Sequence, residues 1–280
     1  MTSMSKNLFV KVPTSIIGQS LVKYDYPMLC YVAKDKGFSM SIRPGTGSLK
    51  VEWPNPLAKY LEKRLSKVFS SRLNSLKIDV LIRSSENLSP MDSLIAIFST
   101  LLREMDPKGF SAYELSRKLA TSSTRIKAVL ESMRSEGLVA YREGEGLAEL
   151  RKDFPWRIGL SIKAPLRFRI YEVEGLEEVF NVAFHALGRA IIMVARSIID
   201  GDFELFRKAL VKYSRLCVAL SGLPLSTLKA YERLSSLKGI ACKVDEDFRG
   251  FILFGEDRNA LDEGLRASSS MGFQAIALMG

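Results

Sequence analysis

Apolar and polar residues alternate in short runs through the first fifty positions of the chain. The runs Leu8–Val12, Phe38–Ile42 and Ser48–Trp53 follow this period of two, and Pro-Gly-Thr-Gly at 44–47 interrupts it. Because successive side chains of a strand point to opposite faces, the pattern predicts β-strands joined by turns. After Pro54-Asn55-Pro56, apolar residues recur at helical spacing from 57 to 69, which predicts a helix before a strand at 77–82.

The middle of the chain changes to helical patterns. A polar loop at 84–90 precedes an apolar helix at 91–102, and a loop between a strand and a helix can present backbone amides to an anion. Two short amphipathic helices follow at 113–119 and 125–133. The hydroxyls of Thr121-Ser122-Ser123 between them suit a helix N-cap. A strand is expected at 138–142.

A second mixed region begins near Phe154-Pro155-Trp156. The pattern predicts strands at 157–162, 166–173, 250–254 and 273–278, and helices at 177–199, 202–220, 226–237 and 260–271. The length of 280 residues favours two packed domains. We therefore expect an α+β chain with domains at 1–153, including the helix pair at 111–134, and 154–280.

Composition narrows the class of protein. Unbroken apolar runs such as 94–102 and 190–195 are shorter than the roughly 20 residues of a membrane span, and no signal peptide is visible, so we expect a cytoplasmic protein. The three cysteines have no metal-ligand spacing and are expected to be buried thiols. Two glutamines beside abundant charged residues fit a heat-adapted, thermophilic source. The net charge of +10 favours a polyanionic partner without separating nucleotide from nucleic acid.

Two local features of the first thirty residues bear on the family. The stretch Val12-Pro13-Thr14-Ser15-Ile16-Ile17-Gly18 reads as a proline-led strand, and Asp25 follows it. Together with the order of elements, these features resemble the GHMP kinase superfamily, which opens with a proline-led strand, and Asp25 stands where archaeal β-ribofuranosylaminobenzene 5'-phosphate synthases carry an aspartate. The resemblance implies a two-domain fold, with a ribosomal-S5-like N-terminal half and a ferredoxin-like C-terminal half. It also implies a transferase that uses ATP or phosphoribosyl diphosphate with Mg²⁺.

The family's main anion loop is a Gly-Leu-Gly-Ser-Ser stretch at a helix N-terminus, and it matches Asn87-Leu88-Ser89-Pro90-Met91-Asp92 here. Both glycines are replaced, Pro90 has no amide hydrogen, and Asp92 adds a negative charge. By the resemblance, Asn87, Ser89 and Ser93 would hold phosphate, with Lys23 and Arg83 as compensating cations. Asp25 and Asp92 would be the candidate metal or base residues.

A late family motif, a Gly/Ser-rich turn entering a strand, matches the stretch from Lys243 to Gly250. Three carboxylates, at 245, 246 and 247, replace small neutral residues there. Such a cluster could coordinate Mg²⁺, because hard cations prefer oxygen ligands, or it could be a solvated acidic turn. We favour the solvated turn, so no protein metal site is expected.

Residues 111–146 also fit a winged helix-turn-helix, with two helices followed by a strand and a glycine-containing hairpin. In that interpretation Ser123, Arg125 and Lys127 lie on the recognition helix, while Arg134 and Arg142 contact phosphate. The leading hypothesis remains a small-molecule enzyme or ligand-binding protein whose ligand is phosphorylated or a nucleotide. The alternatives are a non-catalytic interaction module of the same fold and a DNA-binding regulator. We expect no membrane partner and leave a homodimer open.

Overall fold

The computed structural model describes residues 5–18, 27–53, 58–85, 87–105, 111–119, 121–165, 177–221, 224–245 and 248–279. The chain forms two compact units. Unit 1 comprises Met1–Ser15 and Tyr31–Glu136, and unit 2 comprises Ile16–Cys30 and Gly137–Gly280. The domain boundary expected between 153 and 154 stays a prediction.

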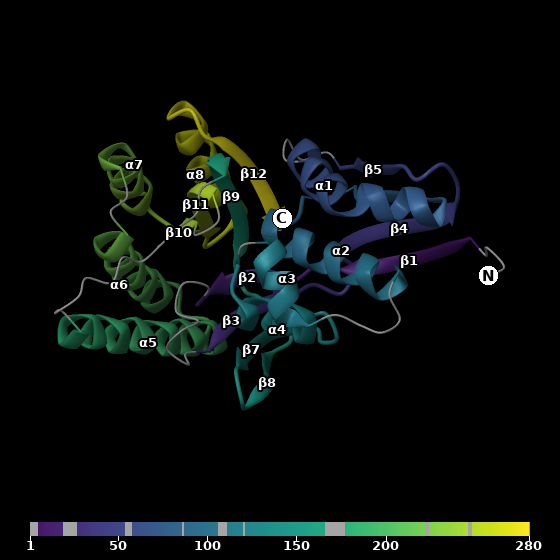
Figure 1. The fold of residues 1–280 in the computed structure, drawn as a ribbon. Coiled ribbons are helices and arrows are strands. Elements are labelled where there is room, and N and C mark those ends of the chain that lie inside the picture. The colour runs from purple at the N-terminus through teal and green to yellow at the C-terminus, as the bar shows by residue number, and fades with distance from the viewer. Residues whose placement is uncertain are drawn as a thin grey trace. The chain divides into compact units, whose positions relative to one another are not determined.

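Unit 1 contains a four-stranded sheet in the order β1-β4-β6-β5. Strands β1, β4 and β5 of this sheet are labelled in Figure 1. Its strands are β1 (Lys6–Lys11), β4 (Gly37–Pro44), β6 (Ile78–Arg83) and β5 (Leu49–Glu52). The first three pair antiparallel, and β5 is parallel to β6 because helix α1 (Ala58–Leu76) connects them. Phe38 and Met40 are buried while Ser39 between them is exposed, so the predicted alternation is confirmed.

Two helices supply a large part of the apolar core of unit 1. Helix α1 buries one residue every four positions, at Leu61, Leu65, Phe69 and Leu73. Helix α2 (Pro90–Met105) is buried on nearly every side, as expected for a helix without a polar face. The rings of Phe69 and Phe98 lie 4.6 Å apart between the two helices. Helices α3 (Ala112–Leu119) and α4 (Ser123–Ser132) pack against each other, which confirms the predicted helix pair.

The turn at 44–48 is held by one carboxylate of the neighbouring strand. Oδ1 of Asp79 accepts hydrogen bonds from the backbone N–H groups of Thr46, Gly47 and Ser48, at 3.0, 3.0 and 2.8 Å. These bonds, the one from Ser48 foremost, hold the pKa of Asp79 below its usual value. Gly47 has a φ of +96°, where a side chain would be strained.

Unit 2 contains an antiparallel sheet in the order β10-β11-β9-β12. Its strands are β10 (Ile240–Asp245), β11 (Phe248–Gly255), β9 (Arg157–Pro165) and β12 (Gln274–Met279). Helix α8 (Arg258–Ser270) packs on this sheet, α7 (Leu225–Ser235) packs on β10, and α5 (Glu177–Asp200) runs beside α6 (Phe203–Ser221) (Figure 1). The predicted helices are confirmed, β10 was missed, and the strand predicted at 166–173 lies outside the described residues.

A further sheet has the order β2-β3-β7-β8, from β2 (Thr14–Ile17), β3 (Met28–Val32), β7 (Gly137–Arg142) and β8 (Gly146–Arg151). Strands β7 and β8 form a hairpin, in agreement with the predicted glycine-containing turn. The core of unit 2 includes an aromatic cluster in which the rings of Trp156 and Phe206 lie 4.3 Å apart.

Helix α5 is the element that bears on membrane insertion. Among the described residues it is the one helix long and apolar enough to span a membrane by length and composition, with a mean hydropathy of 1.6 over its most apolar window. The core helix of a water-soluble protein passes the same test. Leu187, Ile191, Val194 and Ile198 of α5 are fully buried in the protein. The cytoplasmic location stays an expectation.

Candidate functional site

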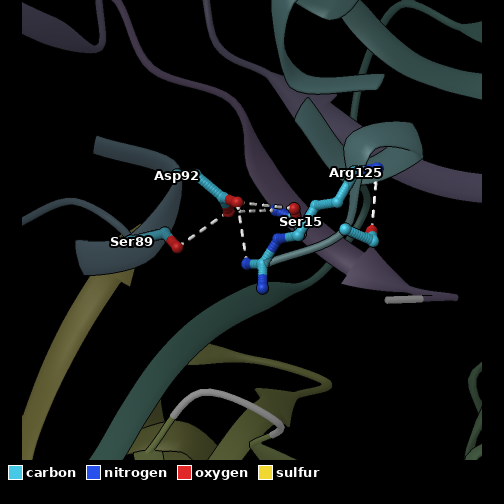
Figure 2. A network of polar contacts seen from close by, with 5 residues as sticks. Ser15, Ser89, Asp92 and Arg125 are labelled. Atoms are coloured by element: carbon cyan, nitrogen blue, oxygen red, sulfur yellow. Dashed lines mark hydrogen bonds and ion pairs between the residues drawn. The ribbon is translucent and has the colours of Figure 1, made fainter. Parts of the chain in front are cut away.

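Asp92 is the centre of a buried polar network at the N-terminus of α2. Its carboxylate is fully buried and accepts four hydrogen bonds (Figure 2). Ser15 donates from its backbone N–H to Oδ2 and from its hydroxyl to Oδ1, both at 2.8 Å. Ser89 Oγ donates to Oδ2 at 2.8 Å, and Nη2 of Arg125 donates to Oδ1 at 3.0 Å. The network therefore joins β2, α2 and α4 through one carboxylate.

The local sequence explains how Asp92 comes to this position. Ser93 N–H donates to the Ser89 carbonyl at 2.9 Å, so Ser89 is the N-cap of α2 and Asp92 is the third residue of the helix. A negative charge in the first turn interacts favourably with the helix dipole. The chain thus supplies its own anion at a helix terminus of the kind that can bind a phosphate.

Arg125 is the counter-charge to this internal anion. It is the third residue of α4, and its side chain is 3% exposed. The hydroxyl of Ser122 accepts from Arg125 N–H at 3.1 Å, which confirms the predicted N-cap in the Thr121–Ser123 stretch. Removing two charges from water costs free energy, and the three serine hydrogen bonds to Asp92 offset part of that cost.

The predicted site residues, both phosphate-binding and catalytic, fall into three groups. Ser89, Asp92 and Ser93 lie in one helical turn, with Asn87 half-buried just before it. Ser93 Oγ is buried and has no hydrogen-bond partner among the residues that the structure describes. Arg83 instead ends β6 and donates to Glu52 at 2.6 Å, with 59% of its side chain exposed. Lys23 and Asp25 lie outside the described residues.

Two members of the network were not predicted as site residues. Ser15 was noted only as part of a proline-led strand. Arg125 was assigned to DNA contact, and that assignment is wrong because its guanidinium is buried against Asp92. The sequence held a signal, since Arg125 falls on the stripe of α4 that includes Ala128, Val129 and Ser132, all buried. A charge on such a stripe indicates a buried partner.

The other residues proposed to contact DNA lie at least partly at the surface. Arg134 is 73% exposed beside Glu131, at 3.4 Å, and Arg142 bonds Glu145 at 2.5 Å. Ser123 and Lys127 are half-buried. The helix pair of the winged-helix interpretation is present, but the side chain placed at the centre of its recognition surface is not available to bases.

Of the three carboxylates in the late acidic motif, the structure describes only Asp245, and this residue does not lie in a solvated turn. Asp245 ends strand β10 and is only 5% exposed, while Glu246 and Asp247 lie outside the described residues. Within the described part of the chain, no group of three or more His, Cys, Asp or Glu side chains is arranged to hold a metal ion.

Comparison with known proteins shows the fold. No family model and no curated protein matches the sequence. Among solved structures, L. major mevalonate kinase in complex with R-mevalonate has a TM-score of 0.60 at 14% identity, covering 99% of this chain and 96% of that one. Mevalonate pyrophosphate decarboxylase from Streptococcus pyogenes has a TM-score of 0.55 at 12% identity, with 100% and 97% covered. Homoserine kinase from Cytophaga hutchinsonii has a TM-score of 0.54 at 12% identity, with 100% and 98% covered.

The fold is the two-domain α+β fold of the GHMP kinases. The predicted fold class is confirmed over essentially the whole chain. The narrower likeness to archaeal β-ribofuranosylaminobenzene 5'-phosphate synthases stays a prediction. Since one fold hosts many reactions, the reaction has to be argued from the site.

Proposed function

We propose that this protein is a kinase-fold enzyme or ligand-binding protein that acts on a phosphorylated or nucleotide small molecule. The supporting observation is the full-length likeness in fold to mevalonate kinase, homoserine kinase and mevalonate pyrophosphate decarboxylase. The transfer reaction would be phosphoryl transfer from ATP or pentosyl transfer from phosphoribosyl diphosphate. Both donors are polyanions, which fits the net charge of +10.

Within this proposal, Asp92 is a positioning residue. Both oxygens of its carboxylate already accept hydrogen bonds from Ser15, Ser89 and Arg125, so the group is fully engaged within the protein. Its role is to hold Ser89 and the first turn of α2 against β2 and α4. Asp25 remains the predicted residue for a metal or base role.

Ser93 is a better phosphate donor in this turn than Ser89. A serine hydroxyl has one hydrogen to donate, and Ser89 already gives its hydrogen to Asp92. The hydrogen of Ser93 Oγ is not used by any described residue. A phosphate oxygen reached by a small movement of the turn would satisfy this buried hydroxyl.

The residues present fit Mg²⁺-bound ATP or phosphoribosyl diphosphate in part. Ser93 offers a donor, and Arg125 offsets the charge of Asp92, so one phosphate group can be accommodated without a net negative neighbour. Mg²⁺ is held largely by waters and substrate phosphates, with one or two protein carboxylates, and Asp25 would be the protein's contribution. When bound, the metal would neutralise the phosphate charge.

The test is calorimetric titration of the full chain with ATP and with phosphoribosyl diphosphate, each with and without Mg²⁺. Ser93→Ala is compared with Ser99→Ala, a buried serine of the same helix whose hydroxyl donates to the Ala96 carbonyl. We expect saturable binding that Ser93→Ala weakens by about tenfold, since a hydrogen bond to a charged group is lost, whereas Ser99→Ala leaves it unchanged. Equal affinity of the Ser93→Ala variant and the original chain would contradict the role of Ser93 as a phosphate donor.

A non-catalytic module of the same fold is the second candidate, and the Asp92–Arg125 pair is the observation that favours it. A carboxylate already occupies the helix terminus at which the family's loop would receive phosphate. Under this alternative, neither ATP nor phosphoribosyl diphosphate shows saturable binding. The same titration therefore decides between the two candidates.

A further inference from the structure

Unit 2 has a pocket of about 320 Å³ formed by three segments. One is the end of β9 with Lys163, and the second is helix α7, with Thr227 and Lys229 in its first half and Arg233 in its last turn. The third is the turn before β12 with Phe273. The volume is at the lower end of the range typical of small-molecule sites. None of these residues belongs to the α2 network described above.

The charge on the pocket wall is of one sign. Lys163, Lys229 and Arg233 line it, and the described lining residues include no carboxylate. Within the described part of the chain, none of these three side chains forms an ion pair. Lys229 and Arg233 are four residues apart on α7, so their like charges lie on one face and destabilise the helix. An anion in the pocket would relieve that repulsion.

The dipole of helix α7 also favours an anion in the pocket. Its N-cap is Pro224, which provides no side-chain hydrogen bond to the first turn. The positive end of the helix dipole is therefore not neutralised by a capping side chain, and Thr227 of this first turn lines the pocket. The dipole adds to the field of the three cations.

The floor of the pocket is apolar. Phe273 is 8% exposed, and Met271 and Ala230 lie beside it among the lining residues. Nζ of Lys163 lies 5.6 Å from the centroid of the Phe273 ring. A cation at this distance interacts favourably with the face of the ring, so the ammonium group of Lys163 lies next to the apolar lining of the pocket.

We propose that this pocket binds a small organic anion that carries at least two negative charges and an apolar group, of which an aryl phosphate is the simplest example. The cations of β9 and α7 would hold the charged end, and Phe273 with Met271 would pack against the apolar end. This assignment is independent of the function proposed for the α2 turn, because the two share no residue.

The experiment titrates phenyl phosphate into the full chain by calorimetry. Two half-probes serve as controls: inorganic phosphate, which carries only the charged part of the molecule, and phenol, which carries only the aromatic ring. The variants are Lys163→Met and Arg233→Met, both at exposed positions where the fold should be preserved. The matched control is Lys212→Met, which removes an exposed lysine of α6 in the same unit but outside the pocket. Ser93→Ala is included to report binding at α2.

We expect each pocket variant to raise the Kd for phenyl phosphate by about tenfold, as for loss of one charge-assisted contact. Lys212→Met and Ser93→Ala should leave it unchanged, and both half-probes should bind more weakly than phenyl phosphate. The proposal is overturned if phenyl phosphate shows no saturable binding, if Lys212→Met weakens binding as much as Lys163→Met, or if inorganic phosphate binds as tightly as phenyl phosphate.

Discussion

Nη2 of Arg125 lies 3.0 Å from Oδ1 of Asp92, and the two side chains are 3% and 0% exposed. The residues are separated by 33 positions in sequence and belong to different helices, α4 and α2. A pair so fully removed from water resists the loss of either partner, because the remaining charge is left buried without compensation.

Replacing Arg125 by methionine should therefore lower the free energy of unfolding by about 3–5 kcal/mol. Urea denaturation followed by circular dichroism measures this loss. Arg134→Met is the control, since Arg134 is 73% exposed, and should change stability by less than about 0.5 kcal/mol. The double variant Asp92→Leu/Arg125→Met should recover much of the loss, because neither charge then remains buried. Equal stability of the Arg125→Met and Arg134→Met variants would contradict the buried pair.

Ser15 tests the same network from the side of β2. Ser15→Ala removes the hydroxyl donor to Oδ1 of Asp92 but keeps the backbone N–H donor to Oδ2. We expect a loss of about 1.5–3 kcal/mol, the usual range for a hydrogen bond to a charged group. Ser75→Ala, at an exposed hydroxyl bonded to the Arg72 carbonyl, should have little effect in the same denaturation experiment. A loss no larger than that of Ser75→Ala would show that the hydroxyl of Ser15 is dispensable.

Asp79 should make stability depend on pH. Its pKa is lowered in the folded chain, so the ionised form contributes stability that is present above the unfolded-state pKa, near 3.9, and lost as pH falls through the folded-state value. Asp79→Asn should therefore destabilise the chain at pH 7 and have a smaller effect near pH 3. Thermal unfolding of both proteins at the two pH values measures the difference. A destabilisation independent of pH would indicate that the charge of Asp79 is unimportant.

The aromatic cluster of unit 2 gives a packing prediction. Phe206 is fully buried between Trp156 and Phe254, with ring centroids 4.3 and 5.0 Å away. Phe206→Ala should cost about 3–5 kcal/mol, from lost apolar burial and from the cavity that remains. Phe9→Ala removes a ring that is 56% exposed and should cost much less. Comparable losses in the two variants would argue against a closely packed cluster.

Much of the fold could be predicted from the sequence because its periodic segments are long. Helix α1 shows its buried stripe directly in the spacing of Leu61, Leu65 and Phe69. Strand β10 could not be found in this way. All six of its residues are buried, including Lys243, so the alternating pattern of a half-buried strand is absent. The charged residues of this stretch suggested a loop instead.

The candidate site was predicted less completely, for a physical reason. The resemblance to the GHMP anion loop, which lies at a helix start, marked Ser89, Asp92 and Ser93. Ser15 and Arg125 reach the same carboxylate only through tertiary packing, and no local pattern pairs residues 77 and 33 positions away. The position of Arg125 on a buried helical stripe was the one available clue.

The three cysteines all fall in unit 2, since Cys30 lies in the 16–30 segment and Cys217 and Cys242 lie beyond residue 137. Each is a buried thiol that is not part of a disulfide, and burial raises the pKa of Cys242. A thiol-specific reagent can therefore react only with molecules in which unit 2 has opened, while unit 1 has no thiol to contribute. The protein carries a natural chemical reporter by which the opening rate of one half can be followed separately from the other.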